Sequence, residues 1–188
     1  PIQTLSTNII GTANLLEAIR ITELDPVVHI CSSSEVYGQV SEKDIPIKED
    51  CPLMPASPYA VSKVGEDMLA FQYWVAHNIK TIRTRMFTHT GPRRGDVFAM
   101  SFFAKQIAAA ELKLIDPVVR VGNLKSVRTF CDVRDAVKAY WLLVNKCKPG
   151  GVYNIGGNRT ATIGEALDIL LSFSKIKLPI ARISIPVP

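Results

Sequence analysis

The sequence lacks the patterns that mark membrane proteins and nucleic-acid-binding proteins. No apolar run in its 188 residues approaches the roughly 20 residues that a membrane-spanning helix needs. The most apolar stretch, 136–144, contains Lys138 and is typical of a helix with one buried face. The formal net charge is +5, but the basic residues are scattered and form no stripe with interleaved aromatic side chains. We therefore expect neither a membrane nor a nucleic acid as a partner.

The sequence also lacks a cysteine motif and a leader segment. Its four cysteines are widely spaced and show neither a C-x-x-C motif nor a Cys/His ligand pattern, so we expect no metal site. The chain starts at Pro1 without a basic-then-apolar leader, and the missing initiator Met indicates a chain cut from a longer one. We expect reduced thiols in a cytoplasmic protein. The cysteines are Cys31, Cys51, Cys131 and Cys147.

Helical patterns and short apolar runs alternate along the chain. Such alternation favours an α/β fold with a parallel sheet, in a chain long enough for about one domain. The segment 175–188 is proline-punctuated, and we expect it to be irregular. The apolar spacing predicts helices over 9–21, 59–77, 97–111, 132–146 and 162–174, and strands over 27–31, 81–87 and 151–157.

Tyr59 and Lys63 lie four residues apart at the start of a predicted helix. Ser57 is a suitable cap for this helix and Pro58 suits its first turn. At this spacing the two side chains share one helix face. A free tyrosine has a pKa near 10, and a neighbouring ammonium stabilises its phenolate, which allows proton exchange with a hydroxyl of a sugar. Taken alone, the pair is equally well explained as a surface contact.

A cluster of polar side chains follows the strand predicted over 27–31. The residues 32–35 are three serines and a glutamate, and ligands of open parallel sheets bind at the carboxyl ends of strands. The cluster would supply hydroxyl donors and a second acid or base. A turn that caps a helix is the alternative explanation of the same residues.

Together these motifs resemble the extended short-chain dehydrogenase/reductase superfamily. The resemblance rests on Ser-Ser-Ser-Glu-Val-Tyr-Gly over 32–38 and Ser-Pro-Tyr-Ala-Val-Ser-Lys over 57–63. The segments 7–18, 129–135 and 152–156 are similar to other parts of that superfamily, in the right order. Within it, 87–95 and 121–128 look most like GDP-mannose 4,6-dehydratases. The chain departs from that family at Thr88, where Asn is usual, and at Ser33, where the family has a catalytic Thr.

The resemblance implies a partial Rossmann-like, doubly wound parallel sheet with part of a small substrate-binding domain. Residues 1–95 would be the C-terminal part of the NAD(P)-binding domain, and 96–188 a mixed substrate-binding region with returning Rossmann elements. The Gly-x-x-Gly-x-x-Gly turn that receives the cofactor pyrophosphate is absent. We therefore expect a truncated chain that is inactive by itself, from a protein that uses NADP or NAD, with NADP favoured by the resemblance.

The resemblance also implies catalytic roles for four residues. Tyr59 would take the proton of the sugar C4 hydroxyl while hydride leaves C4 for the nicotinamide. Lys63 would tune Tyr59 and hold the nicotinamide ribose, and Ser33 would hydrogen-bond the C4 oxygen. Glu35 would remove the C5 proton and help to expel the C6 hydroxyl as water.

Further contacts are implied for the cofactor and for a nucleotide-diphosphate sugar, most simply GDP-mannose. Arginine forks suit the diphosphate because they bind phosphate oxygens in pairs, although each arginine is as easily an ordinary surface residue. The implied cofactor-binding residues, besides Tyr59 and Lys63, are Ser32, Phe87 and His89. The implied substrate-binding residues are Ser34, Thr88, Arg94, Asn123 and Arg128.

Two other functions remain open on the sequence alone. A related GDP-4-keto-6-deoxymannose reductase or a nucleotide-sugar epimerase would share Tyr59 and Lys63 without needing Glu35. A catalytically incomplete binding protein could also keep the fold. In either case the helices over 9–21 and 59–77 correspond to those through which family members pair, so we expect a homodimer or homotetramer.

Overall fold

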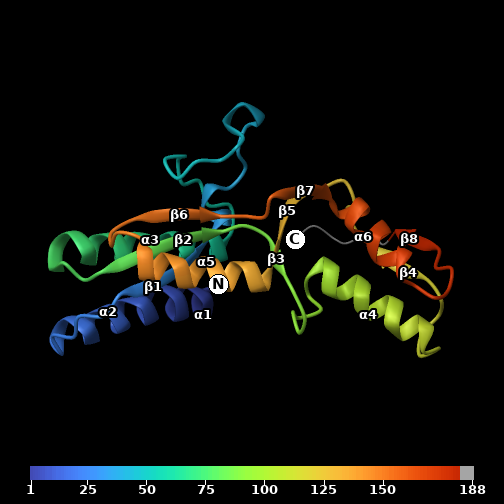
Figure 1. Cartoon of the computed structure of the whole chain (residues 1–188), viewed down its shortest axis with the longest axis horizontal. Helices are drawn as coiled ribbons and strands as arrows, with labels where there is room; N and C mark the ends of the chain where they lie inside the picture. Colours follow the sequence, from blue (N-terminus) through green and yellow to red (C-terminus); the bar gives the residue numbers. More distant parts are fainter. Residues whose placement is uncertain (183–188) are drawn as a thin grey trace. The chain divides into compact units, whose positions relative to one another are not determined.

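A computed structural model describes residues 1–182 of the chain. These residues form two compact units, which are described separately (Figure 1). The first unit contains residues 1–87 and 134–156, and the second contains residues 88–133 and the chain from 157 onward. The assignment of 1–95 to cofactor binding and of 96–188 to substrate binding stays a prediction.

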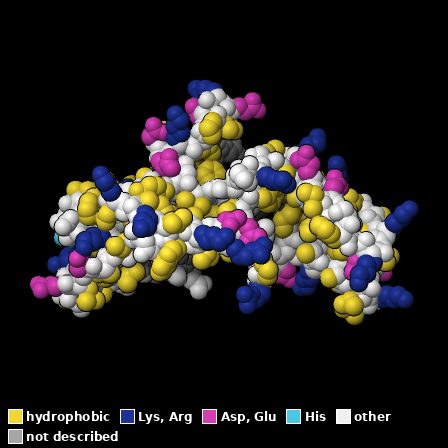
Figure 2. All heavy atoms as spheres, viewed as in Figure 1, with side chains coloured by type: hydrophobic (Ala, Val, Ile, Leu, Met, Phe, Trp, Pro, Cys, Tyr) yellow, Lys and Arg dark blue, Asp and Glu magenta, His cyan; other side chains and the backbone are white. Residues whose placement is uncertain are grey.

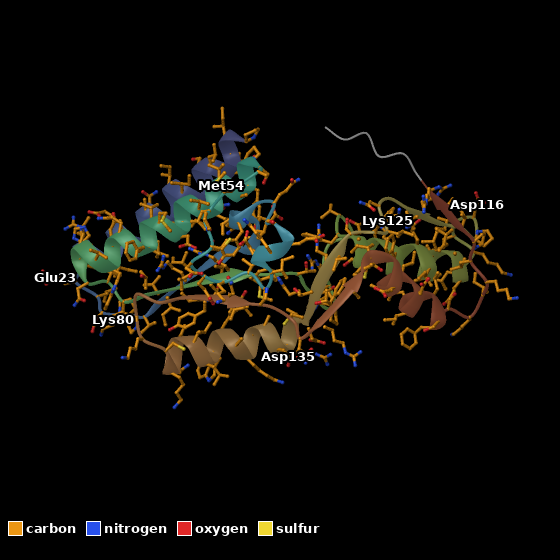
Figure 3. The ribbon with its side chains drawn as sticks, turned by 90° about the horizontal axis from the view of Figure 1, so that it is seen from above. Glu23, Met54, Lys80, Asp116, Lys125 and Asp135 are labelled. Carbon is orange, nitrogen blue, oxygen red and sulfur yellow. The ribbon has the colours of Figure 1, made fainter. Side chains whose placement is uncertain are left out.

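The first unit is built on a three-stranded parallel sheet. Its strands β1 (Val28–Ser33), β2 (Thr81–Met86) and β6 (Val152–Ile155) lie in the order β1-β2-β6. Helices α2 (Gly11–Ile21) and α3 (Pro58–His77) cover one face of this sheet and α5 (Val133–Lys146) covers the other (Figure 3). The sheet is therefore enclosed between helices, which explains the apolar run over 27–31 that leads into β1.

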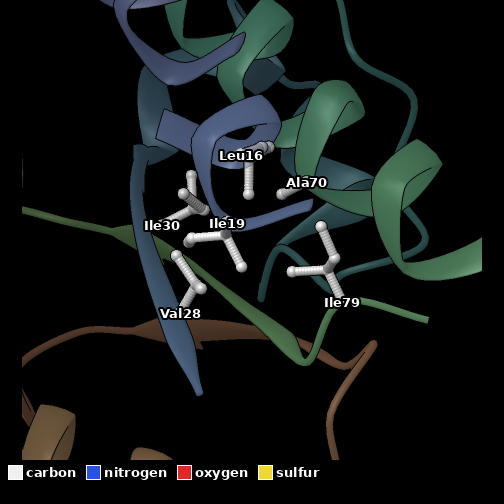
Figure 4. Packing of buried hydrophobic residues seen from close by; sticks show 6 residues of the cluster. All are labelled: Leu16, Ile19, Val28, Ile30, Ala70 and Ile79. Carbon is white, nitrogen blue, oxygen red and sulfur yellow. The ribbon is translucent and has the colours of Figure 1, made fainter. Parts of the chain in front are cut away.

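One hydrophobic cluster joins α2 and α3 to the sheet. Leu16 and Ala70 in this cluster are fully buried. Burial of one aliphatic side chain of this size stabilises a fold by roughly 1.5–3 kcal/mol, so the cluster anchors both helices. Figure 4 shows its side chains pointing toward one another from α2, β1, α3 and the short segment between α3 and β2: Leu16, Ile19, Val28, Ile30, Ala70 and Ile79.

The outer face of α5 is apolar and exposed, whereas its inner face is apolar and buried. Val137, Trp141 and Leu142 are each more than half exposed, and Figure 2 shows hydrophobic side chains on the surface of this part of the first unit. On the inner face Ala136 and Leu143 are buried. Apolar residues thus lie on both faces of this helix.

Helix α3 begins and ends with strong local signals. The Ser57 hydroxyl accepts a hydrogen bond from the backbone N–H of Ala60 at 3.0 Å, and Pro58 occupies the first turn, as predicted. Asn78 ends the helix with a φ of 55°, the left-handed conformation that asparagine tolerates. Within residues 1–182, neither α3 nor a different helix is both long enough and apolar enough to cross a membrane.

The first helix starts earlier than the apolar spacing predicted. The prediction placed its start at residue 9, but the chain is helical from α1 (Ile2–Leu5) through a π-helical turn (Ser6–Ile10) into α2. A π-turn adds a residue to the helical repeat, so the apolar residues before it fall out of the 3.6-residue spacing. The turn lies close to α3, since a Cβ on Gly65 would come within 2.6 Å of the Ile9 side chain.

The second unit contains strands too short to predict from periodicity. Strand β5 (Val127–Asp132) pairs in parallel with β3 (His89–Thr90) and antiparallel with β7 (Arg159–Thr162). Strand β7 thus adds an antiparallel pair to the second unit, apart from the parallel sheet of the first unit. Strand β4 (Val119–Val121) pairs with β8 (Ile180–Arg182), so the prediction of an irregular segment from 175 is wrong for β8. Residues 183–188 lie outside the described part.

Two helices complete the second unit. They are α4 (Ala99–Glu111) and α6 (Ile163–Ser172), and α6 begins with the Thr162–Glu165 capping box. A second hydrophobic cluster packs these helices onto β4, and its buried members are Phe103, Ile107, Val119, Val121 and Leu167. Two 3-10 turns, η2 (Ser34–Tyr37) and η3 (Glu42–Asp44), belong to the first unit.

A buried ionic network ties α3 to the sheet. The Asp67 carboxylate, fully buried, accepts hydrogen bonds from Arg83 Nη1 at 3.0 Å and from Arg85 Nε at 2.7 Å. Burial lowers the pKa of Arg85, but its hydrogen bonds to Asp67 and Tyr37 outweigh this effect and the pKa is raised. One carboxylate thus pairs with two arginines on the same strand.

Substitution Asp67→Asn removes the negative charge that pairs with both arginines. Because a buried charge without its partner is costly, we expect the free energy of unfolding to fall by about 3 kcal/mol. Urea denaturation of the two proteins measures the difference. The exposed Lys80–Asp25 pair gives the control, since Asp25→Asn should change stability by less than about 1 kcal/mol. Equal effects of the two substitutions would contradict this account.

Candidate active site

The serines and the glutamate predicted at the carboxyl end of β1 lie where β1 turns into η2. Ser33 is almost fully buried, and its hydroxyl caps η2 by accepting a hydrogen bond from the backbone N–H of Glu35 at 3.2 Å. Glu35 itself is exposed, and within residues 1–182 its carboxylate has no hydrogen-bond or ion-pair partner. The turn therefore holds the backbone of Glu35 and leaves its carboxylate available.

The turn that carries Glu35 is fixed at its end by a glycine. Gly38 has a φ of 65°, and a Cβ at this position would lie 1.9 Å from the backbone oxygen of Met54. The backbone N–H of Met54 in turn donates to the Val36 carbonyl at 2.9 Å. Only glycine allows this approach of the two segments.

Side-chain contacts hold the same turn against the sheet. The Tyr37 hydroxyl donates to Asn154 Oδ1 at 2.7 Å and accepts from Arg85 Nη1 at 3.0 Å. Asn154 also donates from its backbone to Glu49 at 2.7 Å. Residues of β2, η2, β6 and the loop after η3, which contains Glu49, are thereby linked by one hydrogen-bond network.

Tyr59 and Lys63 lie in the first two turns of α3, which packs against both β1 and η2. The Lys63 ammonium is 5.7 Å from the centroid of the Tyr59 ring. Tyr59 is 41% exposed and can reach a ligand, whereas the Lys63 side chain is only 15% exposed. The predicted sharing of one helix face is confirmed by this contact.

Lys63 is held by groups that the sequence analysis did not select. Its ammonium donates to the backbone oxygen of Cys31 at 3.0 Å and to Glu66 Oε2 at 2.8 Å. The Ser32 hydroxyl donates to the Lys63 carbonyl at 3.2 Å. The sequence signal for Glu66 is an acidic residue one helical turn after Lys63. This signal does not distinguish a site residue, because such pairs are common on exposed helix faces.

Burial changes the acid–base properties of two groups beside Lys63. It raises the pKa of Glu66, against the opposing effect of the Lys63 ammonium. It also raises the pKa of the Cys31 thiol, which Lys63 lowers and Glu66 raises further. Cys31 is exposed, but the Lys63 and Glu66 side chains are only 15% and 11% exposed, so the charges of this pair interact more strongly than in water.

The structure brings together the predicted site residues that belong to the first unit. They lie on the adjoining ends of β1, η2 and α3, and Phe87 follows β2 with its N–H donating to the Ile155 carbonyl at 2.8 Å. The functional roles of these residues stay predictions. The group on β1, η2 and α3 comprises Ser32, Ser33, Ser34, Glu35, Tyr59 and Lys63.

The other predicted site residues belong to the second unit. The Arg94 guanidinium lies 3.9 Å from the centroid of the Phe98 ring, and burial lowers its pKa. Asn123 Oδ1 accepts from the backbone N–H of Lys125 at 2.9 Å, which makes it a turn residue as well as a candidate ligand. Arg128 is exposed and donates to the Val127 carbonyl at 2.7 Å. His89 begins β3, and Thr88 directly precedes it.

Comparison with known sequences identifies relatives over almost the whole chain. A family model described as GDP-mannose 4,6 dehydratase matches residues 1–182. The GDP-6-deoxy-D-mannose reductase of Pseudomonas aeruginosa is 34% identical over 182 residues, which make up 97% of this chain and 60% of the reductase. The GDP-mannose 4,6-dehydratase of Yersinia enterocolitica is 33% identical over 151 residues, 79% of this chain and 40% of that enzyme. The chain thus spans about half the length of these relatives.

Solved structures share the fold. The structure of RMD from Pseudomonas aeruginosa complexed with NADPH matches with a TM-score of 0.91 at 33% identity, covering 95% of this chain and 60% of that chain. The dTDP-glucose 4,6-dehydratase of Bacillus anthracis in complex with NAD matches with a TM-score of 0.85 at 28% identity, covering 97% and 57%. The predicted α/β fold with a Rossmann-like parallel sheet is confirmed. The chain belongs to the GDP-mannose 4,6-dehydratase family of the extended short-chain dehydrogenase/reductase superfamily.

Proposed function

We propose that the protein is a nucleotide-sugar 4,6-dehydratase that converts GDP-mannose to GDP-4-keto-6-deoxymannose with bound NADP or NAD. The observation that carries the proposal is that α3 packs against β1 and η2. Tyr59 and Lys63 lie at the start of α3, Ser33 ends β1, and Glu35 lies on η2. The match to the GDP-mannose 4,6 dehydratase model and the dehydratase relatives support it.

The proton transfers of this reaction are assigned to three side chains. Tyr59 takes the proton of the C4 hydroxyl, and Ser33 donates a hydrogen bond to the C4 oxygen as the ketone forms. The C5 proton, made acidic by that ketone, passes to Glu35, which gives a proton to the departing C6 hydroxyl so that it leaves as water. The proton that Tyr59 took from the C4 hydroxyl balances the one that C5 regains once C6 has been reduced. Glu35 suits this role because its carboxylate is exposed and unpaired within the described residues, while its backbone is held by η2.

Lys63 fits the place of a cofactor-binding residue. An ammonium has three N–H donors, and within residues 1–182 two protein acceptors, Cys31 O and Glu66 Oε2, lie within hydrogen-bond distance of it. A third donor then serves a ribose hydroxyl of the nicotinamide cofactor. When bound, the cofactor would supply the acceptor for the C4 hydride and its return to C6. Ser32, Phe87 and His89 are the further residues proposed for this site.

The substrate contacts are proposed for residues with phosphate-binding or hydrogen-bonding chemistry. Arg94 and Arg128 carry guanidinium groups that can pair with a diphosphate. Ser34, Thr88 and Asn123 offer hydrogen-bonding groups for the sugar and the nucleotide. Thr88 lacks the amide usual at its position, so it can donate only through a hydroxyl. Measuring turnover with different nucleotide sugars tests which nucleotide and which sugar these residues accept.

We also propose that the protein forms a homo-oligomer through α2 and α3. Several apolar side chains on these helices remain 38–67% exposed, which is unusual for a face without a partner. They are Leu15, Ile21, Val61, Met68, Phe71 and Val75.

Substitution Glu35→Gln tests the dehydration step. Since the amide cannot accept the C5 proton, we expect the rate of 4-keto-6-deoxy sugar formation by the full-length protein to fall by about 100-fold or more. Product analysis after incubation with GDP-mannose measures it. Glu42→Gln alters another exposed carboxylate, on η3, and should leave the rate unchanged. Full dehydration by the Glu35→Gln protein would refute the assignment.

Substitution Tyr59→Phe tests the hydride-transfer step, which every enzyme of this type requires. Because the ring is retained and only the hydroxyl is lost, we expect kcat to fall by about 100- to 10,000-fold with an unchanged unfolding temperature. Initial rates and thermal unfolding measure both quantities. Tyr73→Phe removes a hydroxyl elsewhere on α3, where it donates to Glu17, and serves as the control. Similar losses in both variants would exclude a specific role for Tyr59.

Reduction of the 4-keto-6-deoxy sugar is the second candidate function. It is favoured by the 34% identity and 97% coverage of the match to the Pseudomonas aeruginosa reductase. A reductase consumes one reduced cofactor per product, whereas a dehydratase regenerates its cofactor. Measuring NADPH oxidation with each sugar nucleotide distinguishes the two. Stoichiometric oxidation with the 4-keto-6-deoxy substrate, without dehydration of GDP-mannose, would replace the first proposal with the second.

A further inference from the structure

Lys63 has a long side chain whose ammonium must stay in one place to serve the site. A lysine side chain loses considerable rotamer freedom when it is fixed. In this chain the position is set from two sides, by the carbonyl of Cys31 at 3.0 Å on β1 and by the carboxylate of Glu66 at 2.8 Å on α3. The carbonyl is a fixed backbone group, so Glu66 is the side chain that completes the arrangement.

Glu66 is poorly explained as a contribution to stability. Its side chain is only 11% exposed, and burial raises its pKa above the ordinary value near 4.5 despite the nearby ammonium. A carboxyl group whose pKa is raised on folding favours the folded state below its ordinary pKa and loses that contribution as the pH rises. At neutral pH, ionisation of Glu66 therefore opposes folding. The groups that face it are Lys63 from its own helix and the Cys31 thiol from β1.

We propose that Glu66 is a positioning residue for Lys63. Its carboxylate directs the Lys63 ammonium toward β1, so that the remaining N–H points to the bound ligand. This inference rests on the proposed function insofar as Lys63 serves a nicotinamide cofactor. The contact between Glu66 and Lys63 itself does not depend on which sugar nucleotide reacts.

The ordinary alternative is a helix-stabilising pair of the kind found on exposed faces. The chain contains such a pair on α5, where Lys138 donates to Asp135 at 3.3 Å with both side chains at least 67% exposed. Solvent screens that pair. The Lys63–Glu66 pair is screened far less because both side chains are at most 15% exposed. Removing the Glu66 carboxylate should therefore change the chemical reactivity of the Lys63 amine and leave that of an exposed lysine such as Lys138 unaffected.

Competitive acylation of the full-length protein, followed by mass spectrometry of each lysine, tests this directly. Only the neutral amine reacts, so loss of the Glu66 charge in Glu66→Gln should raise the labelling rate of Lys63 by about fivefold. Lys138 in the same sample is the internal reference. The matched control is Asp135→Asn, which should change the labelling of Lys138 by less than about twofold. An unchanged Lys63 rate in Glu66→Gln overturns the proposal.

Turnover and thermal unfolding separate positioning from folding. We expect Glu66→Gln to unfold at or above the wild-type temperature and to lower kcat by about tenfold, with the KM for the sugar nucleotide within twofold. Glu66→Asp keeps the charge with a shorter reach and should recover part of the loss. Should Glu66→Gln fail to fold, the Lys63 labelling rate of Glu66→Leu, which also removes the charge, decides, and a wild-type rate overturns the proposal.

The two proposals fail in different ways. If no sugar nucleotide is converted by the wild-type protein, the proposed function fails, but the labelling rates still judge the role of Glu66. If turnover is present and the labelling of Lys63 is indifferent to Glu66, only the positioning role fails.

Discussion

The buried carboxylate of Asp67 is the constraint on which the first unit depends. It accepts hydrogen bonds from Arg83 and Arg85 of β2, and Arg85 also donates to the Tyr37 hydroxyl. A side chain of α3 is thereby connected through the sheet to η2. Tyr59 lies on α3 and Glu35 lies on η2. The same buried charges therefore hold in place both elements that carry the candidate site. Such networks are rigid because each partner left unpaired would be costly.

Adjacent acidic residues on α3 have different environments. Asp67 faces two arginines and the sheet, while Glu66 faces a single lysine and a thiol beside the end of β1. The first carboxylate is fully compensated and holds the helix in place. The second carries a burial penalty that its partner only partly offsets. Asp67, which supports the structure, and Glu66, the proposed positioning residue for Lys63, are thus neighbours on the same helix.

The sequence predicted the elements whose signals are local. Three local signals follow from neighbouring residues: the apolar run of β1, the alternating pattern of β2 and the Ser57 cap of α3. The positions of Ser33, Glu35, Tyr59 and Lys63 at element ends follow from them as well. The π-turn before α2 could not be predicted because its extra residue disrupts the spacing, and β3, β4, β7 and β8 have two to four residues, too few for a period. Burial of Arg83 and Arg85 depends on Asp67, which lies 16 and 18 residues away in the chain.

The two candidate reactions make different demands on the same framework. Both need a tyrosine and a lysine at the start of a helix that packs on the end of a strand, and this arrangement is specified by the capped α3 and by Asp67. Only dehydration needs a second base, and Glu35 occupies a turn whose backbone is fixed by Ser33 and Gly38. An exposed carboxylate costs little there, since it remains solvated until a ligand covers it. Under the proposed roles, the two candidate reactions therefore differ at Glu35 and share the buried network.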